Sequence, residues 1–188
     1  MRRRFLVSFP NLPIDRGDVK KGANKPAVAR ACRCVNVGLF LSHDLRRDVE
    51  VLLLIGPKEN LGSIAFPGKT LKRVAPDERS VSFFLLKAYR ILQGLQPDSS
   101  ETMDNGIVVS RTSLDKLYKF NSSKAVYLSR DTKASHLIGG GIKQYADYIY
   151  ECEEGYFGSL SHSSQIIFRP PNPERMILDV NVYCDQMK

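Results

Sequence analysis

An apolar run, DVEVLLLIG at residues 48–56, is the feature that most constrains how this chain folds. Polar and apolar positions do not alternate along it, so both faces of the segment must be buried, and Gly56-Pro57 ends it. Strands buried on both faces are typical of parallel sheets that are covered by helices. We therefore expect an α/β domain with a mostly parallel sheet and this run near its centre.

Helix and strand patterns alternate on both sides of this run. Residues 27–41 form a largely apolar segment that predicts a buried helix, with Pro26 in its first turn. Residues 75–94 predict an amphipathic helix that ends at Gly94, with one face made by Val81, Phe84, Leu85, Ala88, Ile91 and Leu92. Further strands are expected at FLVSF, GIVVS, KAVYLS and ADYIYECEE. A hairpin is expected at SIAFPGKTLKRV (63–74), turning at Pro67-Gly68, and a helix at TSLDKLYKF, where Thr112 and Asp115 resemble a capping box.

The first ten residues favour a strand over a targeting segment. Their apolar stretch breaks at Pro10, which is too short for a signal peptide, and no apolar run approaches the roughly 20 residues that span a bilayer. We therefore expect a cytoplasmic protein without a membrane segment. Residues 10–26 are polar, basic and rich in Gly and Pro, and predict a mobile loop. The four cysteines lack zinc-ligand spacing, so buried thiols and no bound metal are expected.

The charge balance points to a polyanionic partner. The chain of 188 residues has a net charge of +8 at pH 7 and a pI near 9.4, which is high for a chain of this size. Nucleic acid is the partner class that such a balance favours.

Two polar clusters could carry chemistry. SHDLRRDV (42–49) follows the first predicted helix, so Arg46 and Arg47 could either neutralise the negative end of the helix dipole or bind a phosphate or developing anion. PDERS (76–80) begins the amphipathic helix, where Asp77 and Glu78 suit the cap and the dipole. Arg79 opposes that dipole, so its presence favours a functional site. Gly139–Gly141 indicates only a turn.

Three stretches in this order resemble one family: RCVNVGLFLSHDLRRDVEVLLLIG (33–56), IAFPGKTLKRVAPDERS (64–80) and the helix that follows. They are similar to the archaeal tRNA (pseudouridine-54-N1)-methyltransferases of the SPOUT class, from about Phe5 to Leu92. The resemblance implies one SPOUT methyltransferase-like domain over residues 1–188, with a mostly parallel sheet and a trefoil knot in a cofactor-binding region at about 124–188. It also implies a homodimer that uses S-adenosyl-L-methionine to methylate N1 of pseudouridine 54 in the T-loop of tRNA.

The same resemblance suggests where the cofactor binds. AVYLSRDT (125–132) is similar to the family strand and loop that touch it. One alignment sets YIYECEEGYFG on the family's glycine loop, IIFRPPNP on the next loop and RMILDVNVYCD on the final helix. It predicts cofactor contacts from Leu128, Gly155, Phe168, Arg169, Pro170, Pro171 and Met176. A second alignment, with LIGGG (137–141) on the glycine loop and GSLSHSSQII (158–167) on the later segment, stays open.

Methyl transfer to a ring nitrogen requires alignment of donor and acceptor and loss of the ring N–H. We expect Arg46 or Arg79 to stabilise the anionic ring, and Asp77 or Glu78 to orient the arginine or accept the proton. Phosphate contacts are expected from Arg2, Arg3, Arg4, Lys20, Lys21, Lys25 and Arg47.

Two other functions remain open from the sequence. A non-catalytic RNA-binding SPOUT homologue would have a degenerate cofactor pocket. A metal-dependent nuclease would use Asp77, Glu78 and the acids of ECEE (151–154). Dependence on the methyl donor or on magnesium would separate them.

Overall fold

The computed structural model describes residues 3–119, 125–130, 142–153, 157 and 165–187. Along the chain the elements are β1 (Arg3–Phe9), α1 (Arg16–Lys21), α2 (Pro26–Leu39), β2 (Val49–Ile55), β3 (Leu61–Pro67), α3 (Glu78–Gly94), β4 (Ser100–Thr102), β5 (Val108–Thr112), α4 (Leu114–Lys119), β6 (Val126–Arg130), β7 (Asp147–Glu151), β8 (Gln165–Phe168) and α5 (Pro173–Gln186). Within these residues one eight-stranded sheet has the order β4-β5-β3-β2-β1-β7-β6-β8.

The sheet is parallel at its centre and on one side. β1 runs parallel to β2 and β7, and β6 runs parallel to β7 and β8, whereas β3, β4 and β5 form an antiparallel extension next to β2. The α/β prediction with a mostly parallel sheet is confirmed. Three parallel strands, β7, β6 and β8, therefore end at the same edge, which is the usual place for a ligand in open α/β sheets.

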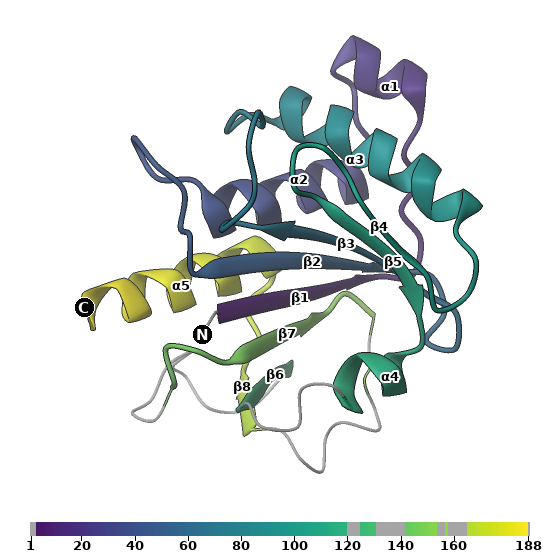
Figure 1. The fold of residues 1–188 in the computed structure, drawn as a ribbon. Helices are drawn as coiled ribbons and strands as arrows, with labels where there is room; N and C mark the ends of the chain where they lie inside the picture. The colour runs from purple at the N-terminus through teal and green to yellow at the C-terminus, as the bar shows by residue number, and fades with distance from the viewer. Residues whose placement is uncertain (1–2, 120–124, 131–141, 154–156, 158–164, 188) are drawn as a thin grey trace.

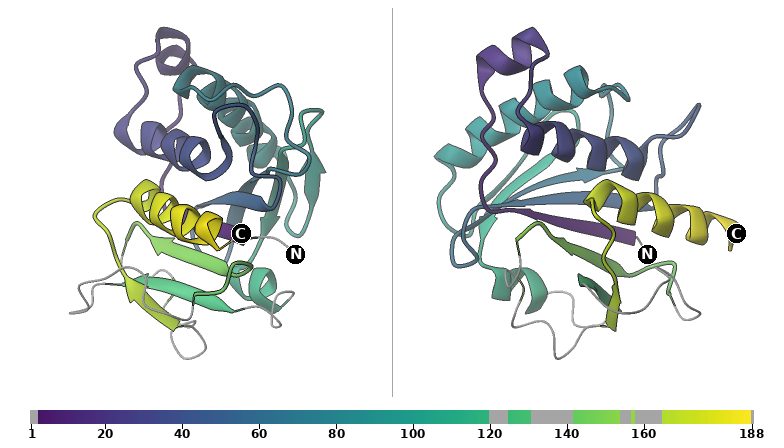
Figure 2. Two further views of the ribbon diagram at one scale, coloured as in Figure 1. Left: turned by 90° about the vertical axis from the view of Figure 1, so that its left-hand side faces the viewer. Right: turned by 180° about the vertical axis from the view of Figure 1, so that it is seen from behind.

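The run at 49–55 is buried on both faces, as its composition predicts. Val51 and Leu53 alternate with Leu52 and Leu54, and the two pairs belong to different core clusters. Helices α2, α3 and α5 lie over one face of the sheet, and α4 lies on the other side (Figures 1 and 2). The larger core is the one under α2, α3 and α5, which together contribute many of its buried side chains.

The predicted hairpin at 63–74 is wrong. Residues 61–67 form the single strand β3, and the hairpin is instead made by β2 and β3 with its turn at residues 56–60. Gly68 does not turn into a second strand but passes close to the preceding loop: a Cβ there would lie 2.0 Å from the backbone oxygen of Arg46. The sequence predicts neither β4 nor β8, since polar composition indicates a connector at 100–102 and the family resemblance indicates a loop at 166–173.

Two local predictions are also corrected. The segment 10–26 contains helix α1, which Asp15 caps by accepting hydrogen bonds from the N–H groups of Gly17 and Asp18. Those bonds lower the pKa of Asp15, and Val19 anchors the helix with a buried side chain. The cap of α4 is Ser113, whose hydroxyl accepts the N–H of Lys116 at 3.4 Å, because Thr112 still belongs to β5.

The predicted trefoil knot depends on the path of the chain around residues 131–141 and 154–164. Apart from Phe157, these positions lie outside the described residues. None of the helices in the described ranges is long and apolar enough to cross a membrane.

The cysteines are packed as the sequence predicts, and their reactivity provides a test. Cys32, Cys34 and Cys184 are buried and Cys152 is partly buried, and all four are free thiols. Burial raises the pKa of Cys32 to about 12 and that of Cys152 to about 11. We expect alkylation of the native protein at pH 8 to be at least about tenfold slower than in denaturant, because the thiolate fraction is small. Fast labelling of Cys32 or Cys34 under native conditions, followed by mass spectrometry, would contradict this packing.

Candidate functional site

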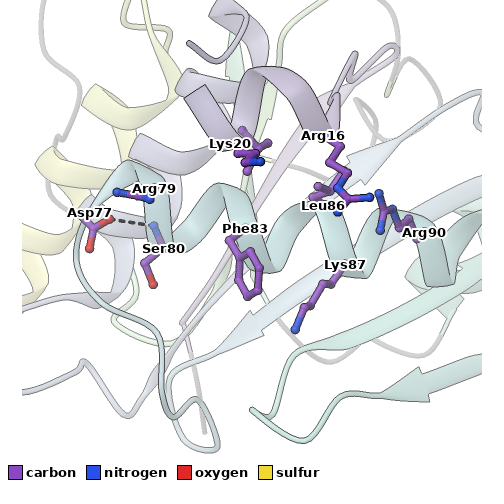
Figure 3. Close-up of a pocket in the computed structure, with 10 residues that line it drawn as sticks. Arg16, Lys20, Asp77, Arg79, Ser80, Phe83, Leu86, Lys87 and Arg90 are labelled. Carbon is purple, nitrogen blue, oxygen red and sulfur yellow. Dashed lines mark hydrogen bonds between the residues drawn. The ribbon is translucent and has the colours of Figure 1, made fainter. Parts of the chain in front are cut away.

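A groove of about 660 Å³ lies between α1 and the first four turns of α3. We call it the basic groove, and its lining residues are Arg16, Val19, Lys20, Asp77, Arg79, Ser80, Phe83, Leu86, Lys87 and Arg90 (Figure 3). The two helices are brought together by sequence-distant packing, since α1 precedes the first crossover helix and α3 follows the β2–β3 hairpin. The groove is therefore a product of the fold and not of a single motif.

The basic groove is strongly positive. Five cationic side chains line it against the single carboxylate of Asp77: Arg16, Lys20, Arg79, Lys87 and Arg90. Neighbouring like charges repel one another, so the clustering of these cations does not itself stabilise the fold. It suits the binding of a polyanion, and phosphates in particular.

The three residues of the PDERS cluster have different surroundings. Asp77 caps α3, with its Oδ1 accepting the N–H of Ser80 at 2.7 Å. Glu78 accepts a hydrogen bond from the side-chain amide of Asn24 at 2.9 Å, which ties the α1–α2 connection to α3. Arg79 is exposed and lines the basic groove. Of the predicted catalytic residues, Asp77 and Arg79 therefore share one site.

Arg46 lies elsewhere, at the carboxyl end of α2. Its Nη1 donates to the carbonyl oxygens of Val37 and Phe40 at 3.4 and 3.3 Å, and its Nε donates to Asp185 of α5 at 3.0 Å. The side chain is only 13% exposed. The sequence left two roles open for Arg46, neutralising the end of a helix or binding an anion. These contacts support the first role.

Replacing Arg46 by alanine is expected to lower the free energy of unfolding by about 2–3 kcal/mol, because the α2 carbonyls and Asp185 lose a charged donor. Arg47 provides the matched control, since its side chain is 55% exposed and bonds only the carbonyl of Gly68 and Asp44 among the contacts the structure gives. Its replacement is expected to cost less than about 1 kcal/mol. Urea titration of both variants measures the difference, and equal costs would argue against a structural role for Arg46.

Two arginines predicted to contact phosphates are inside the protein, and that prediction is corrected. Arg3 is fully buried and donates to the carbonyl of Gln144 and to the side chain of Asn181. Arg4 is 5% exposed and forms a two-bond ion pair with the buried Asp147. Buried cations with these partners cannot reach a nucleic acid, whereas Arg2 lies outside the described residues.

The lysines of the predicted phosphate-binding set are on the surface. Lys20, Lys21 and Lys25 are exposed on α1 and immediately before α2, and Lys20 lines the basic groove. Sequence reasoning did not single out Phe83, Lys87 and Arg90. The signal for Phe83 was present, because it falls outside the apolar face of its helix.

The predicted cofactor residues fall into three sets. Leu128 and Met176 are fully buried in the two separate core clusters, so their side chains offer no contact to a bound molecule. The segment Phe168–Pro171 leaves β8 at the carboxyl edge of the parallel strands. Gly155 lies outside the described residues.

Contacts with β7, which lies beyond β6 in the sheet, hold this segment in place. Arg169 donates to the carbonyl oxygen of Glu151 at 2.7 Å, and its guanidinium lies 5.1 Å from the ring centroid of Tyr150. The hydroxyl of Tyr150 donates to the carbonyl oxygen of Pro170 at 2.8 Å. Arg130 approaches the carboxylate of Glu151 at 3.8 Å. The edge therefore combines a positioned loop with charged groups.

No cluster of three or more histidine, cysteine, aspartate or glutamate side chains suited to a metal ion occurs among the described residues. The acids proposed for a nuclease are also dispersed, since Asp77 and Glu78 begin α3 and Glu151 ends β7.

Comparison with known proteins identifies the family. A family model described as "Putative SAM-dependent RNA methyltransferase" matches residues 26–137, which include α2, the 42–49 cluster and α3. The chain belongs to this methyltransferase family. The predicted family membership is thus confirmed.

Three relatives illustrate the extent of the match, and each is named tRNA (pseudouridine(54)-N(1))-methyltransferase. The protein of Methanocella arvoryzae is 35% identical over 69% of this chain and 67% of its own length. That of Methanococcoides burtonii is 32% identical over 76% and 73%. That of Methanococcus maripaludis is 49% identical, but over only 37% of this chain and 33% of its own length.

Proposed function

We propose that this protein is an S-adenosylmethionine-dependent RNA methyltransferase that methylates N1 of pseudouridine at position 54 of the tRNA T-loop. The observation that carries the proposal is the position of Arg79, which lines the basic groove from within the part of the chain that matches the methyltransferase family. The names of the relatives supply the substrate nucleotide. The net charge of +8 suits tRNA as the partner.

In the proposed reaction, S-adenosylmethionine supplies an electrophilic methyl group to the ring nitrogen. Loss of the ring N–H leaves negative charge on the base, and the guanidinium of Arg79 would stabilise that charge. Because α3 packs on β3 and β5, several strands away from β6 and β8, the donor would have to reach the base across the proposed homodimer, from the partner protomer. Asp77, which lines the same groove, would orient Arg79 or accept the proton directly or through a water molecule. Glu78 contributes indirectly by holding Asn24 and with it the connection that follows α1.

The cofactor would bind at the carboxyl edge of β6, β7 and β8. We assign its contacts to the segment Phe168–Pro171, which leaves β8 at that edge. A trefoil knot formed by the C-terminal region, and a homodimer, complete the proposal by analogy with the SPOUT class. Size-exclusion chromatography with light scattering tests the dimer, and binding of the donor measured by calorimetry tests the pocket.

A second candidate is a non-catalytic RNA-binding protein of the same family. The burial of Leu128 and Met176 favours it, because two of the expected cofactor contacts are closed. Calorimetry with S-adenosylmethionine separates the two candidates. Absence of detectable heat at millimolar donor would favour the binding protein.

The direct test is mass analysis of tRNA nucleosides after incubation with the protein and isotopically labelled donor. One tRNA carries pseudouridine at position 54 and a matched tRNA carries uridine. We expect label in N1-methylpseudouridine from the first tRNA alone. Label elsewhere would change the nucleotide assignment, and absence of label would remove the enzymatic proposal.

Replacing Lys20, Lys21 and Lys25 together by alanine is expected to weaken tRNA binding and to lower the slope of log K against log salt. Each lost phosphate contact removes about 0.9 from that slope on a duplex. Filter binding at several salt concentrations measures it, with Lys58→Ala as a control for loss of an exposed lysine on the β2–β3 turn. An unchanged slope in the triple variant would exclude these lysines from the interface.

A further inference from the structure

Phe83 is an exposed aromatic residue of α3. Its side chain is 46% exposed, while Val81, Leu85 and Ala88 of the same helix are fully buried. Most large apolar side chains of α3 face the core, whereas Phe83 lies outside that face, lines the basic groove and points to the same side of α3 as Lys87 (Figure 3). Single exposed apolar side chains are common, and five others occur among the described residues, but Phe83 is the aromatic one and it lines a groove of cations. This combination, and not exposure alone, points to binding.

The ring of Phe83 is held in a defined environment. The ring of Phe84 contacts it at right angles, with 5.2 Å between centroids. The ammonium group of Lys87 lies 4.4 Å from the Phe83 centroid. Lys87 and Phe83 point to the same side of α3, with Arg79 and Arg90 further along the helix on either side (Figure 3). An aromatic surface flanked by cations along one groove is the arrangement that binds single-stranded nucleic acid.

We propose that the basic groove binds a single-stranded segment of RNA, with one unpaired base stacked on Phe83 and the adjoining phosphates on Arg16, Lys20, Lys87 and Arg90. The inference rests on the proposed function in taking RNA as the substrate, and it adds the structural class that the groove selects. A paired base has both faces covered by its neighbours in the helix, so a duplex can satisfy the cations but not the ring. The groove should therefore distinguish looped RNA from duplex RNA without reading sequence.

The chain has no tryptophan, so Phe83→Trp introduces a single tryptophan, which can be excited selectively over the tyrosines. The probes are an RNA stem-loop, a blunt duplex with the same stem and inorganic polyphosphate. Stacking should quench the fluorescence of the Phe83→Trp variant by at least half at saturation with the stem-loop, and little with the duplex or with polyphosphate. Leu178→Trp on α5, at a site that is 42% exposed, is the matched control and should respond weakly to all three probes.

The binding affinities of Phe83 variants, compared with the affinity of the wild-type protein, provide an independent test. Phe83→Leu should weaken stem-loop binding by about tenfold, the scale of one lost stacking contact, and change duplex binding less than about twofold. Phe83→Tyr should retain the affinity of the wild type. Lys87→Ala should weaken both probes, whereas Lys58→Ala on the β2–β3 turn should weaken neither appreciably.

Equal quenching of the Phe83→Trp variant by all three probes, or equal affinities of the Phe83→Leu variant and the wild type for the stem-loop, would overturn the proposal and leave a purely electrostatic surface. Stacking without any labelled nucleoside would leave the inference standing and remove the methyltransferase proposal. Labelled nucleoside without stacking would do the reverse. If neither RNA binds but an acidic peptide does, the groove is a protein-binding surface and the inference fails.

Discussion

Replacing Asp147 by asparagine is expected to lower the free energy of unfolding by about 3–5 kcal/mol, the cost of removing one partner from a buried ion pair. Asp147 is fully buried at the start of β7 and accepts two hydrogen bonds from the guanidinium of Arg4 in β1. Asparagine preserves the shape of the side chain but leaves the charge of Arg4 in the interior beside a neutral amide. The pair joins β1 to β7, one of the three strands at the proposed cofactor edge. Its loss should therefore destabilise that edge as well as the centre of the sheet.

Asp98→Asn is the matched control for this variant. Asp98 pairs with Lys116 on the surface, where the two side chains are 53% and 54% exposed. Its replacement is expected to cost less than about 1 kcal/mol, because water already screens the pair. Urea unfolding followed by circular dichroism measures both variants. A cost below about 1 kcal/mol for Asp147→Asn would mean that the Arg4 charge is solvated in a way the structure does not show.

Hydropathy patterns that extend over many residues were sufficient to predict the core elements. The apolar run at 49–55 is buried on both faces, and the spacing of apolar residues in 75–94 identifies the helix and its end at Gly94. These predictions succeed because burial of both faces of a strand makes nearly every position apolar, and burial of one helix face imposes a period of about 3.6 residues on the sequence. Short elements have no such period, so the six-residue helix α1 and the strands β4 and β8 were missed.

The candidate site was predicted less completely, because charge alone does not reveal where an arginine lies. Arg3 and Arg4 look like surface cations in the sequence, and only the register of β1 beside β7 shows that both are enclosed. Arg46 and Arg79 were equivalent candidates until the packing of α5 placed Asp185 beside Arg46. The groove itself depends on the contact of α1 with α3, which no local pattern encodes.

Replacing Arg79 by alanine is expected to lower kcat for methyl transfer by more than about tenfold, the scale of losing one contact to a charge that develops in the transition state. The same change should leave the fold intact or stabilise it slightly. Arg79 is exposed in the first turn of α3, where a cation opposes the helix dipole, so its removal is expected to gain about 0.3–1 kcal/mol. A residue that costs stability and supports turnover is the pattern expected of a functional side chain.

Arg90→Ala separates catalysis from phosphate binding in this experiment. Arg90 lines the same basic groove, about one helical turn beyond Leu86. Its loss should raise KM for tRNA while leaving kcat within about twofold. Initial rates with labelled donor over a range of tRNA concentrations give both parameters for each variant, and thermal melts give their stability. If Arg79→Ala raises KM as Arg90→Ala does and leaves kcat unchanged, Arg79 is one more phosphate contact. The stabilisation of the anionic base would then have to come from another group in the groove.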